Sequence, residues 1–440
     1  MQQSRRMGRA GIPLLATILA TSVFVAPAGA TPGITECRNV VVPVTVGGAT
    51  GPIAGTLCTP PGAKAVQLLV SGWTYNRGYF DFGYQPETYS YAQAANRDGY
   101  ATLAIDRLGS GASLHPLSLF DTFEADVRTV HEVVSALRGG SLGTAFSSVA
   151  TVGHSVGAAV VATEAGKYHD VGALVTTGFS HAYNYANGYV SAVGRDEPAV
   201  GDPRFAGLAL DPLYVTSDPG TAGRSGSLYY APNADPAVVA YDDEHLRDTD
   251  NLVEGATFST YPVNDSTRTL DVPVLDVAGD HDPLFCGLTG GPCSSSATLA
   301  EFEKRFYAPG APVEAYVVLH TGHDLTLEKT SPESTARILE FVDAHLGQGR
   351  GATETTRGPR PPLPRPEPAQ PSAPATLLST AFVTAVQPLA EAYDKAVPSV
   401  PGLGDQTSVY SNPAAAAMLA EVSGLVDQFA GDAVQSSLGG

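Results

Sequence analysis

The segment SVATVGHSVGAAVVAT, residues 148–163, decides the fold that we predict for this chain. Its β-branched first residues predict a strand, and the small residues after Gly157 predict a helix. Between them, the turn Gly153-His-Ser-Val-Gly157 places Ser155 at its apex, in the pattern of a nucleophile elbow. The two glycines let neighbouring elements come close enough to tolerate the strained backbone of such a turn. A plain Gly/Ser loop is the alternative interpretation.

Further strands and helices alternate on both sides of this segment. A hairpin is predicted over residues 38–58. After it, apolar runs predict strands at residues 65–70, 100–106, 171–177, 272–278 and 313–319. Periodic patterns predict helices at residues 88–98, 123–137, 297–306 and 331–346. Strands that alternate with helices at this spacing favour an α/β fold, a doubly wound and mostly parallel sheet.

The predicted α/β domain covers residues 31–347 and contains one irregular insertion. Residues 180–268 are rich in Gly, Pro, Asp and Tyr and show little strand pattern. Because so long a plain loop would be unusual, we expect a cap over the carboxyl edge of the sheet. A Pro-rich linker at 348–375 and an Ala-rich helical tail at 376–440 follow. The tail has an amphipathic pattern, so we expect it to dock on the core, or to bind a partner or a cell-envelope component.

The amino-terminal residues predict export from the cytoplasm. Residues 1–30 combine three arginines, a short apolar run and a closing Ala28-Gly-Ala30, which is typical of a signal peptide. The apolar run is too short for a comfortable membrane span, and no later segment is long enough. An even number of cysteines in an oxidising compartment favours two disulfides. Proximity in the sequence suggests Cys37–Cys58 and Cys286–Cys293, although other pairings are possible.

The formal net charge of −19 makes some partners improbable. An acidic surface repels nucleic acid and anionic membranes. The cysteine and histidine spacing shows no zinc-binding motif, so we expect neither a metal nor a cofactor.

Acyl transfer by a serine needs a base and a carboxylate that orients the base. On a sheet of this kind the acid and then the histidine follow the serine, each just beyond a strand. For the acid, Asp282 is preferred over Asp280, a turn carboxylate, and over Asp276, which lies inside a strand. For the base, His323 follows a glycine on a loop and is preferred over His320, which we expect to be a hydrogen-bonded histidine at the strand end.

Backbone N–H groups of Val156 and Trp73 are the candidate donors of an oxyanion hole. His154, inside the turn, is expected to point away from Ser155 and to serve packing. The run Asp106–Gly111 is expected to form a hydrogen-bonded turn at the edge of the site.

Taken together, these motifs make residues 38–347 resemble the α/β-hydrolase superfamily, in a secreted, esterase- or lipase-like form. The resemblance rests on Gly153–Gly157, Ser71-Gly-Trp73, Asp106–Gly111, Gly279–Asp282 and Gly322-His323. It implies Ser155 as nucleophile, Asp282 as the orienting acid and His323 as general base. One departure is that Ser71-Gly72 stands where the family usually has His-Gly.

The resemblance and the Tyr-rich insertion together favour a hydrolase of carboxylic esters, with a small-molecule or lipid ester as substrate. An aminopeptidase, amidase or acyltransferase could use the same triad. An aminopeptidase would need acidic cap residues for the substrate ammonium group, and Asp242-Asp243-Glu244 is either such a group or a solvated acidic run. The hypothesis from another class is an envelope-attached binding protein with an inert hydrolase core.

Overall fold

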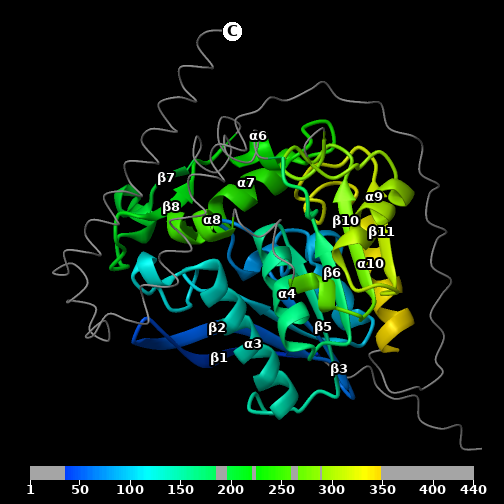
Figure 1. Ribbon diagram of the computed structural model, residues 1–440. Coiled ribbons are helices and arrows are strands. Elements are labelled where there is room, and N and C mark those ends of the chain that lie inside the picture. The colour runs from blue at the N-terminus through cyan, green and yellow to red at the C-terminus, as the bar shows by residue number, and fades with distance from the viewer. Residues whose placement is uncertain (1–34, 185–195, 221–223, 259–265, 288–289, 348–440) are drawn as a thin grey trace, which may run out of the picture. The chain divides into compact units, whose positions relative to one another are not determined.

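The computed structural model describes residues 35–184, 196–220, 224–258, 266–287 and 290–347. In these residues, eight strands form one sheet in the order β1-β2-β4-β3-β5-β6-β10-β11 (Figure 1). Strand β2 is antiparallel to both neighbours, and the other neighbouring pairs are parallel. The strands are β1 (Glu36–Val46), β2 (Ala49–Thr59), β3 (Ala65–Val70), β4 (Ala101–Ile105), β5 (Ser148–His154), β6 (Ala173–Thr177), β10 (Val274–Gly279) and β11 (Val313–Val318). The predicted fold class is confirmed.

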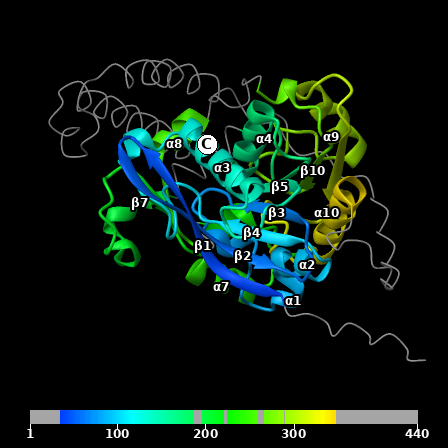
Figure 2. The ribbon, with the colours of Figure 1, turned by 90° about the horizontal axis from the view of Figure 1, so that it is seen from below.

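Helices cover both faces of this sheet, as a doubly wound fold requires. Figure 2 shows α3, α4 and α9 on one side of the strands and α1 and α2 on the other, where α10 also packs. The helices are α1 (Pro86–Tyr89), α2 (Tyr91–Arg97), α3 (Phe123–Gly139), α4 (Val156–Tyr168), α9 (Ser296–Glu303) and α10 (Ser331–Leu346). The face of α3 that the periodicity predicts to be apolar is buried in the core, namely Phe123, Val127, Val130, Val134 and Leu137. The sheet therefore separates two hydrophobic clusters.

The segment between β6 and β10 lies beside the carboxyl ends of the strands (Figure 1). It holds the three-stranded antiparallel sheet β7-β8-β9 and the helices α6, α7 and α8, although its sequence shows little strand pattern. Their bounds are β7 (Asp196–Pro198), β8 (Tyr214–Ser217), β9 (Thr249–Asn251), α6 (Arg224–Leu228), α7 (Pro236–His245) and α8 (Leu252–Phe258). Strands of three or four residues are too short to produce a period-2 pattern. This segment is called the cap below.

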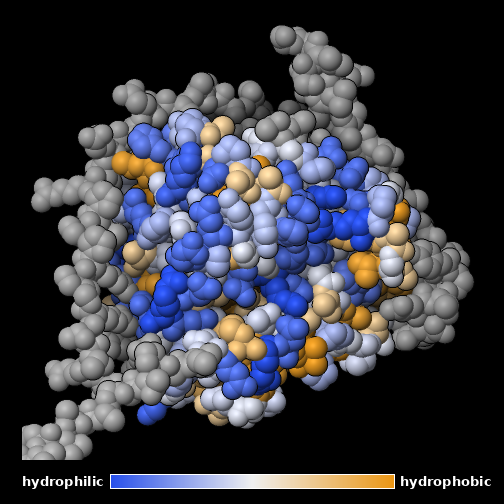
Figure 3. Space-filling model, turned by 180° about the vertical axis from the view of Figure 1, so that it is seen from behind, coloured by the Kyte–Doolittle hydropathy of each residue, from blue (hydrophilic) through white to orange (hydrophobic). Residues whose placement is uncertain are grey.

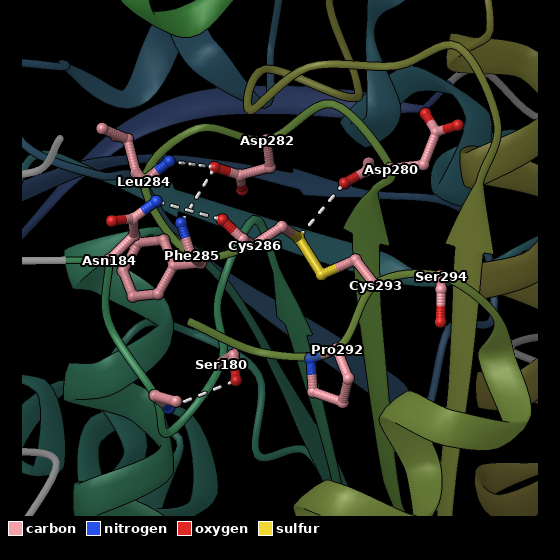
Figure 4. The surroundings of a disulfide bond; sticks show 12 residues. Ser180, Asn184, Asp280, Asp282, Leu284, Phe285, Cys286, Pro292, Cys293 and Ser294 are labelled. Atoms are coloured by element: carbon pink, nitrogen blue, oxygen red, sulfur yellow. Dashed lines mark hydrogen bonds between the residues drawn. A yellow bond between two sulfur atoms is a disulfide. The ribbon is translucent and has the colours of Figure 1, made fainter. Parts of the chain in front are cut away.

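The two disulfides join the cysteines that sequence proximity suggested. Cys37 and Cys58 are directly opposite in the β1–β2 register, with their Cα atoms 4.0 Å apart. Cys286 and Cys293 close a short loop after β10, with a Cα separation of 5.6 Å (Figure 4). The described residues contain no free cysteine.

The described surface exposes little apolar area. Figure 3 shows a face on which hydrophilic residues dominate and apolar ones are scattered. Among the described residues, the exposed large hydrophobic side chains are Val41, Val200 and Leu208. No described helix combines the length and the apolar character needed to cross a bilayer. The predicted signal peptide, linker and helical tail lie outside the described residues.

The close packing behind Ser155 gives a first prediction. A Cβ added at Gly157 would lie 2.2 Å from the Ser71 carbonyl oxygen and 2.5 Å from that of Val70, both of them backbone atoms. Gly157→Ala should therefore destabilise the protein by about 1–3 kcal/mol or more, because β3 and α4 must separate. Gly139→Ala is the matched control, since a Cβ there meets no atom within 4 Å. Urea unfolding of both variants checks this, and equal midpoints would contradict the predicted packing.

Candidate active site

Ser155 has the backbone conformation of a sharp turn between β5 and α4. Its φ of 55° and ψ of −124° lie where side-chain-bearing residues are strained. Its N–H donates to the Thr177 carbonyl (2.9 Å), and its own carbonyl accepts from the Ala158 N–H (2.9 Å). Gly72 lies so close that a Cβ on it would come within 2.7 Å of the Ser155 Cβ. The turn is thus fixed by β6, by α4 and by the residues that follow β3.

Asp282 and His323 form a hydrogen-bonded pair. The Nδ1 atom of His323 is 2.9 Å from Oδ2 of Asp282, and both side chains are almost fully buried. The other carboxylate oxygen, Oδ1, accepts from the backbone N–H groups of Leu284 (2.8 Å) and Phe285 (3.1 Å), which Figure 4 shows. These donors fix the carboxylate, so that one oxygen remains directed at the imidazole. The Cys286–Cys293 loop follows directly and joins this turn to α9.

His323 packs against the residue that precedes Ser155. Its ring centroid is 4.6 Å from that of His154, the residue before Ser155, and its ring is parallel to that of Phe285. The N–H groups of His323 and Asp324 both donate to the carbonyl of Leu228, the last residue of α6 (2.8 and 3.0 Å). The loop that carries His323 is therefore bound to the cap.

The surroundings of His323 raise its pKa. Burial alone would lower the pKa, since it penalises the imidazolium. The negative charge of Asp282 and its hydrogen bond favour the imidazolium, and they outweigh burial. The geometry thus supplies an imidazole that accepts a proton readily while its tautomer is fixed by Asp282.

Val156 and Trp73 belong to the two segments that meet at the Ser155 turn. Val156 is the first residue of α4, and Trp73 follows β3, which is next to β5 in the sheet. Within the described residues neither backbone N–H donates a hydrogen bond. The Trp73 indole donates to Oδ2 of Asp196 in β7 (2.7 Å) and packs beside Gly255 in α8. This side chain therefore connects the cap to the segment after β3.

The rejected candidates occupy other positions. Asp280 is a turn carboxylate, as expected, because its Oδ1 accepts from the Thr321 N–H (3.1 Å). Asp276 is buried inside the sheet and hydrogen-bonded to Thr176. His320 is exposed, with a φ of 57°, so the expectation of a hydrogen-bonded histidine at the strand end was wrong. The chain turns sharply at His320 and carries its side chain into solvent.

His154 is buried and stacked on Tyr79, with ring centroids 4.2 Å apart, as the packing role predicts. It also has a polar contact. Its Nε2 lies 3.2 Å from Oδ1 of Asp324. Burial lowers the pKa of His154 to about 4, although Asp324 opposes that effect. His154 is therefore neutral at ordinary pH, beside His323.

The sequence did not reveal a buried polar network beneath the cap. The hydroxyl of Tyr75 lies between two carboxylates, 2.6 Å from Oδ2 of Asp324 and 2.9 Å from Oδ2 of Asp242, and its single proton can be donated to one of them at a time. Tyr229 donates to Asp242 (2.9 Å). Arg224 pairs with Asp242 at 2.9 Å and lies over the Tyr75 ring, 3.6 Å from its centroid. Asp242 is thus buried and paired with Arg224, so the expectation of a solvated acidic run was wrong for this residue, whereas Glu244 of the same run is exposed.

A second buried cluster surrounds Arg107, in the turn after β4. Its guanidinium pairs with Asp126 of α3, Asp250 of β9 and Glu254 of α8, and its Nε donates to the carbonyl of Ser71. These groups are almost completely buried. The expected hydrogen-bonded turn at Asp106–Gly111 is present, and it also places Arg107 at the centre of the buried cluster. The signal in the sequence that could have revealed this buried cluster is an arginine directly after an apolar strand.

Aromatic side chains line the side of His323 that faces the cap. Phe285, parallel to the His323 ring, contacts Phe179 and Tyr183 (ring centroids 5.4 and 5.0 Å apart), and Tyr183 contacts Phe258 of α8 (6.0 Å). The cap tyrosines Tyr214 and Tyr229 instead donate hydrogen bonds to buried carboxylates. Apolar character near the site therefore comes from phenylalanines and Tyr183 rather than from the cap tyrosines as a group.

Solved structures similar to this chain include three hydrolases. An esterase from Thermogutta terrifontis is 17% identical, with a TM-score of 0.45, over 70% of this chain and 99% of that one. A monoacylglycerol lipase from Paleococcus ferrophilus is 14% identical, with a TM-score of 0.44 and coverage of 70% and 99%. An alpha/beta hydrolase from Novosphingobium aromaticivorans is 16% identical, with a TM-score of 0.46 and coverage of 70% and 100%. No curated protein matches the sequence significantly.

The family model of the alpha/beta hydrolases matches residues 67–338, which is more than half of the chain. This match begins in β3 and ends in α10, so it includes the turn at Ser155 and the loops of Asp282 and His323. The chain therefore belongs to the alpha/beta hydrolase family.

Proposed function

We propose that this protein is a serine hydrolase that cleaves carboxylic esters through an acyl-enzyme on Ser155. The observation that carries the proposal is the Asp282–His323 pair, bonded at 2.9 Å, beside a serine held at a φ of 55°. His323 takes the proton of Ser155 as the hydroxyl attacks the ester carbonyl, and it then protonates the leaving alcohol. Water completes the cycle by the same route and regenerates Ser155.

The N–H groups of Val156 and Trp73 are the proposed donors to the oxyanion. Val156 begins α4, so its N–H also lies at the positive end of the helix dipole. Donors of this kind, set in place before the reaction, stabilise the developing negative charge without reorganisation. Gly72 supports this role because it lets the Trp73 segment approach Ser155.

The aromatic side chains beside His323 support an ester with an apolar acyl or alcohol group. Phe285 lies parallel to the His323 ring, and Phe179 and Tyr183 extend this aromatic cluster, Tyr183 as far as Phe258 of α8. The aminopeptidase alternative loses its main support, because Arg224 already neutralises Asp242. Amidase and acyltransferase activity remain as outcomes of the tests below.

An extracytoplasmic location is part of the proposal. The two disulfides suit an oxidising compartment, and the first 30 residues have the pattern of a signal peptide. We further propose that neither nucleic acid nor a cofactor takes part in the reaction, and that the tail after residue 375 docks on the core or binds an envelope component.

Ser155→Ala should abolish ester hydrolysis. With p-nitrophenyl esters from acetate to palmitate, we expect kcat to fall at least about 10⁴-fold, because no nucleophile remains. The chain-length optimum of the wild type measures the size of the acyl pocket. Ser141→Ala, at an exposed loop serine, is the matched control. A serine-reactive phosphonate should label the wild type once and Ser155→Ala not at all.

Each other outcome of this experiment has a meaning. Labelling of Ser155 without turnover of any ester would indicate an amidase or an acyltransferase that lacks its acceptor. Absence of both labelling and turnover would refute the proposal and favour the binding protein with an inert core.

The pH profile tests the Asp282–His323 pair. A raised His323 pKa means that the imidazole becomes protonated, and inactive as a base, as the pH falls below a midpoint above about 6.5. Asp282→Asn removes the charge that raises the pKa, so the acid limb of kcat/KM should move to lower pH. In addition, kcat should fall about 10⁴-fold.

Asp280→Asn is the matched control for this profile, because an amide oxygen can still accept the Thr321 N–H. We expect it to keep the wild-type acid limb. If Asp280→Asn shifts the limb and Asp282→Asn does not, the assignment of the acid is wrong.

A further inference from the structure

A cluster of three side chains that could bind a metal ion lies away from Ser155. His131 belongs to α3, Glu164 to α4, and Asp170 to the loop that leads into β6. One ligand atom from each lies within 4.8 Å of the others. Asp170 precedes β6, whereas Ser155 follows the parallel strand β5, so the two lie toward opposite edges of the sheet. Along α4, Glu164 is about 13 Å from Ser155, at a rise of about 1.5 Å per residue.

The distances within this cluster fit a small divalent cation. Nδ1 of His131 is 3.3 Å from Oε1 of Glu164 and 3.0 Å from Oδ2 of Asp170. Ligands bound tetrahedrally to Zn²⁺ at about 2.0–2.2 Å are separated by about 3.4 Å. Two of the three ligand pairs therefore already have nearly the spacing that such an ion requires.

The cluster also contains carboxylate oxygens that lack hydrogen-bond partners. Glu164 is fully buried, and neither its Oε2 nor Oδ1 of Asp170 has a hydrogen-bond partner among the described residues. Burial and, to a smaller extent, the charge of Asp170 together raise the pKa of Glu164 to about 9. A cation bound between the two carboxylates would neutralise their charge and give these oxygens a partner.

The site is open to solvent from one side. The His131 and Asp170 side chains keep 29% and 18% of their surface exposed. Asp170 also lines a surface pocket of about 310 Å³ that reaches His169 and His345. His131 is stacked on Tyr168, with ring centroids 3.6 Å apart and planes 8° apart, which fixes the imidazole before a ligand binds.

The other clusters of the described residues are weaker candidates. His154, His323 and Asp324 belong to the proposed active site. Asp280, His281 and His320 meet on the surface, but both histidines are exposed and Asp280 already accepts the Thr321 N–H. That surface cluster contains no buried atom without a partner, and it serves below as a control.

We propose that His131, Glu164 and Asp170 bind one Zn²⁺, with water as the fourth ligand. Imidazole and carboxylate are ligands that zinc prefers, whereas Ca²⁺ favours sites made of oxygen alone. The ion joins α3 to α4, the helix that begins next to Ser155. Its role is structural, since none of its ligands reaches the serine.

The test uses the full protein, stripped of metal with a chelator and titrated with ZnCl₂. Calorimetry should show one Zn²⁺ per chain, and the melting temperature should rise with zinc concentration. Glu164→Gln and Asp170→Asn should each weaken binding at least about tenfold. His281→Ala, the matched control at the surface cluster, should bind zinc as the wild type does, and CaCl₂ should have no effect.

The opposing result is a cluster that binds no metal. In that case zinc neither binds in a 1:1 ratio nor raises the melting temperature, and Glu164→Gln is as stable as the wild type in every buffer. Loss of binding in His281→Ala alone would also overturn the proposal. If Glu164→Gln fails to fold, Asp170→Asn, at a partly exposed loop residue, gives the same information. Repeating the titration with Ser155→Ala separates this inference from the proposed esterase activity.

Discussion

The backbone of Ser155 is the constraint on which the rest of the molecule depends. A non-glycine residue at a φ of 55° costs about 1–3 kcal/mol, so the surroundings must hold it there. Hydrogen bonds to Thr177 and Ala158 fix both sides of the turn. Gly72 and Gly157 allow the segment after β3 to lie so close to the Ser155 turn that a Cβ atom at either position would clash. The strained backbone of Ser155 therefore requires both the central position of β5 and the close packing of the neighbouring segments.

Buried ion pairs fix the cap on this core. Arg107 joins the turn after β4 to α3, β9 and α8, and Arg224 joins α6 to Asp242 in α7 and to the Tyr75 ring. A buried ion whose partner is displaced is strongly destabilising, so such pairs tolerate few alternative arrangements. The Arg107 side chain also reaches the Ser71 carbonyl. The position of the cap and the segment proposed to stabilise the oxyanion are thus mechanically connected.

The parts that could be predicted from sequence are those with a local signal. Apolar runs predict the buried strands, and Asp282 and His323 could be selected as candidates because each follows such a run. Asp242 shows the limit of this approach, because its neighbours Asp243 and Glu244 made it look solvated. Its real environment depends on Arg224, 18 residues away, and on Tyr75, 167 residues away. Asp324 was overlooked for the same reason, since its partner Tyr75 lies 249 residues earlier.

The attachment of the His323 loop to α6 has a consequence for how a substrate gains access. The carbonyl of Leu228 accepts two backbone N–H groups of that loop, and Glu328 accepts from both Gly322 and Tyr230. If the end of α6 swung away as a lid, the imidazole would lose the support that keeps it beside the serine. An opening motion that leaves the catalytic groups assembled must therefore hinge elsewhere in the cap, with α6 behaving as part of the fixed wall.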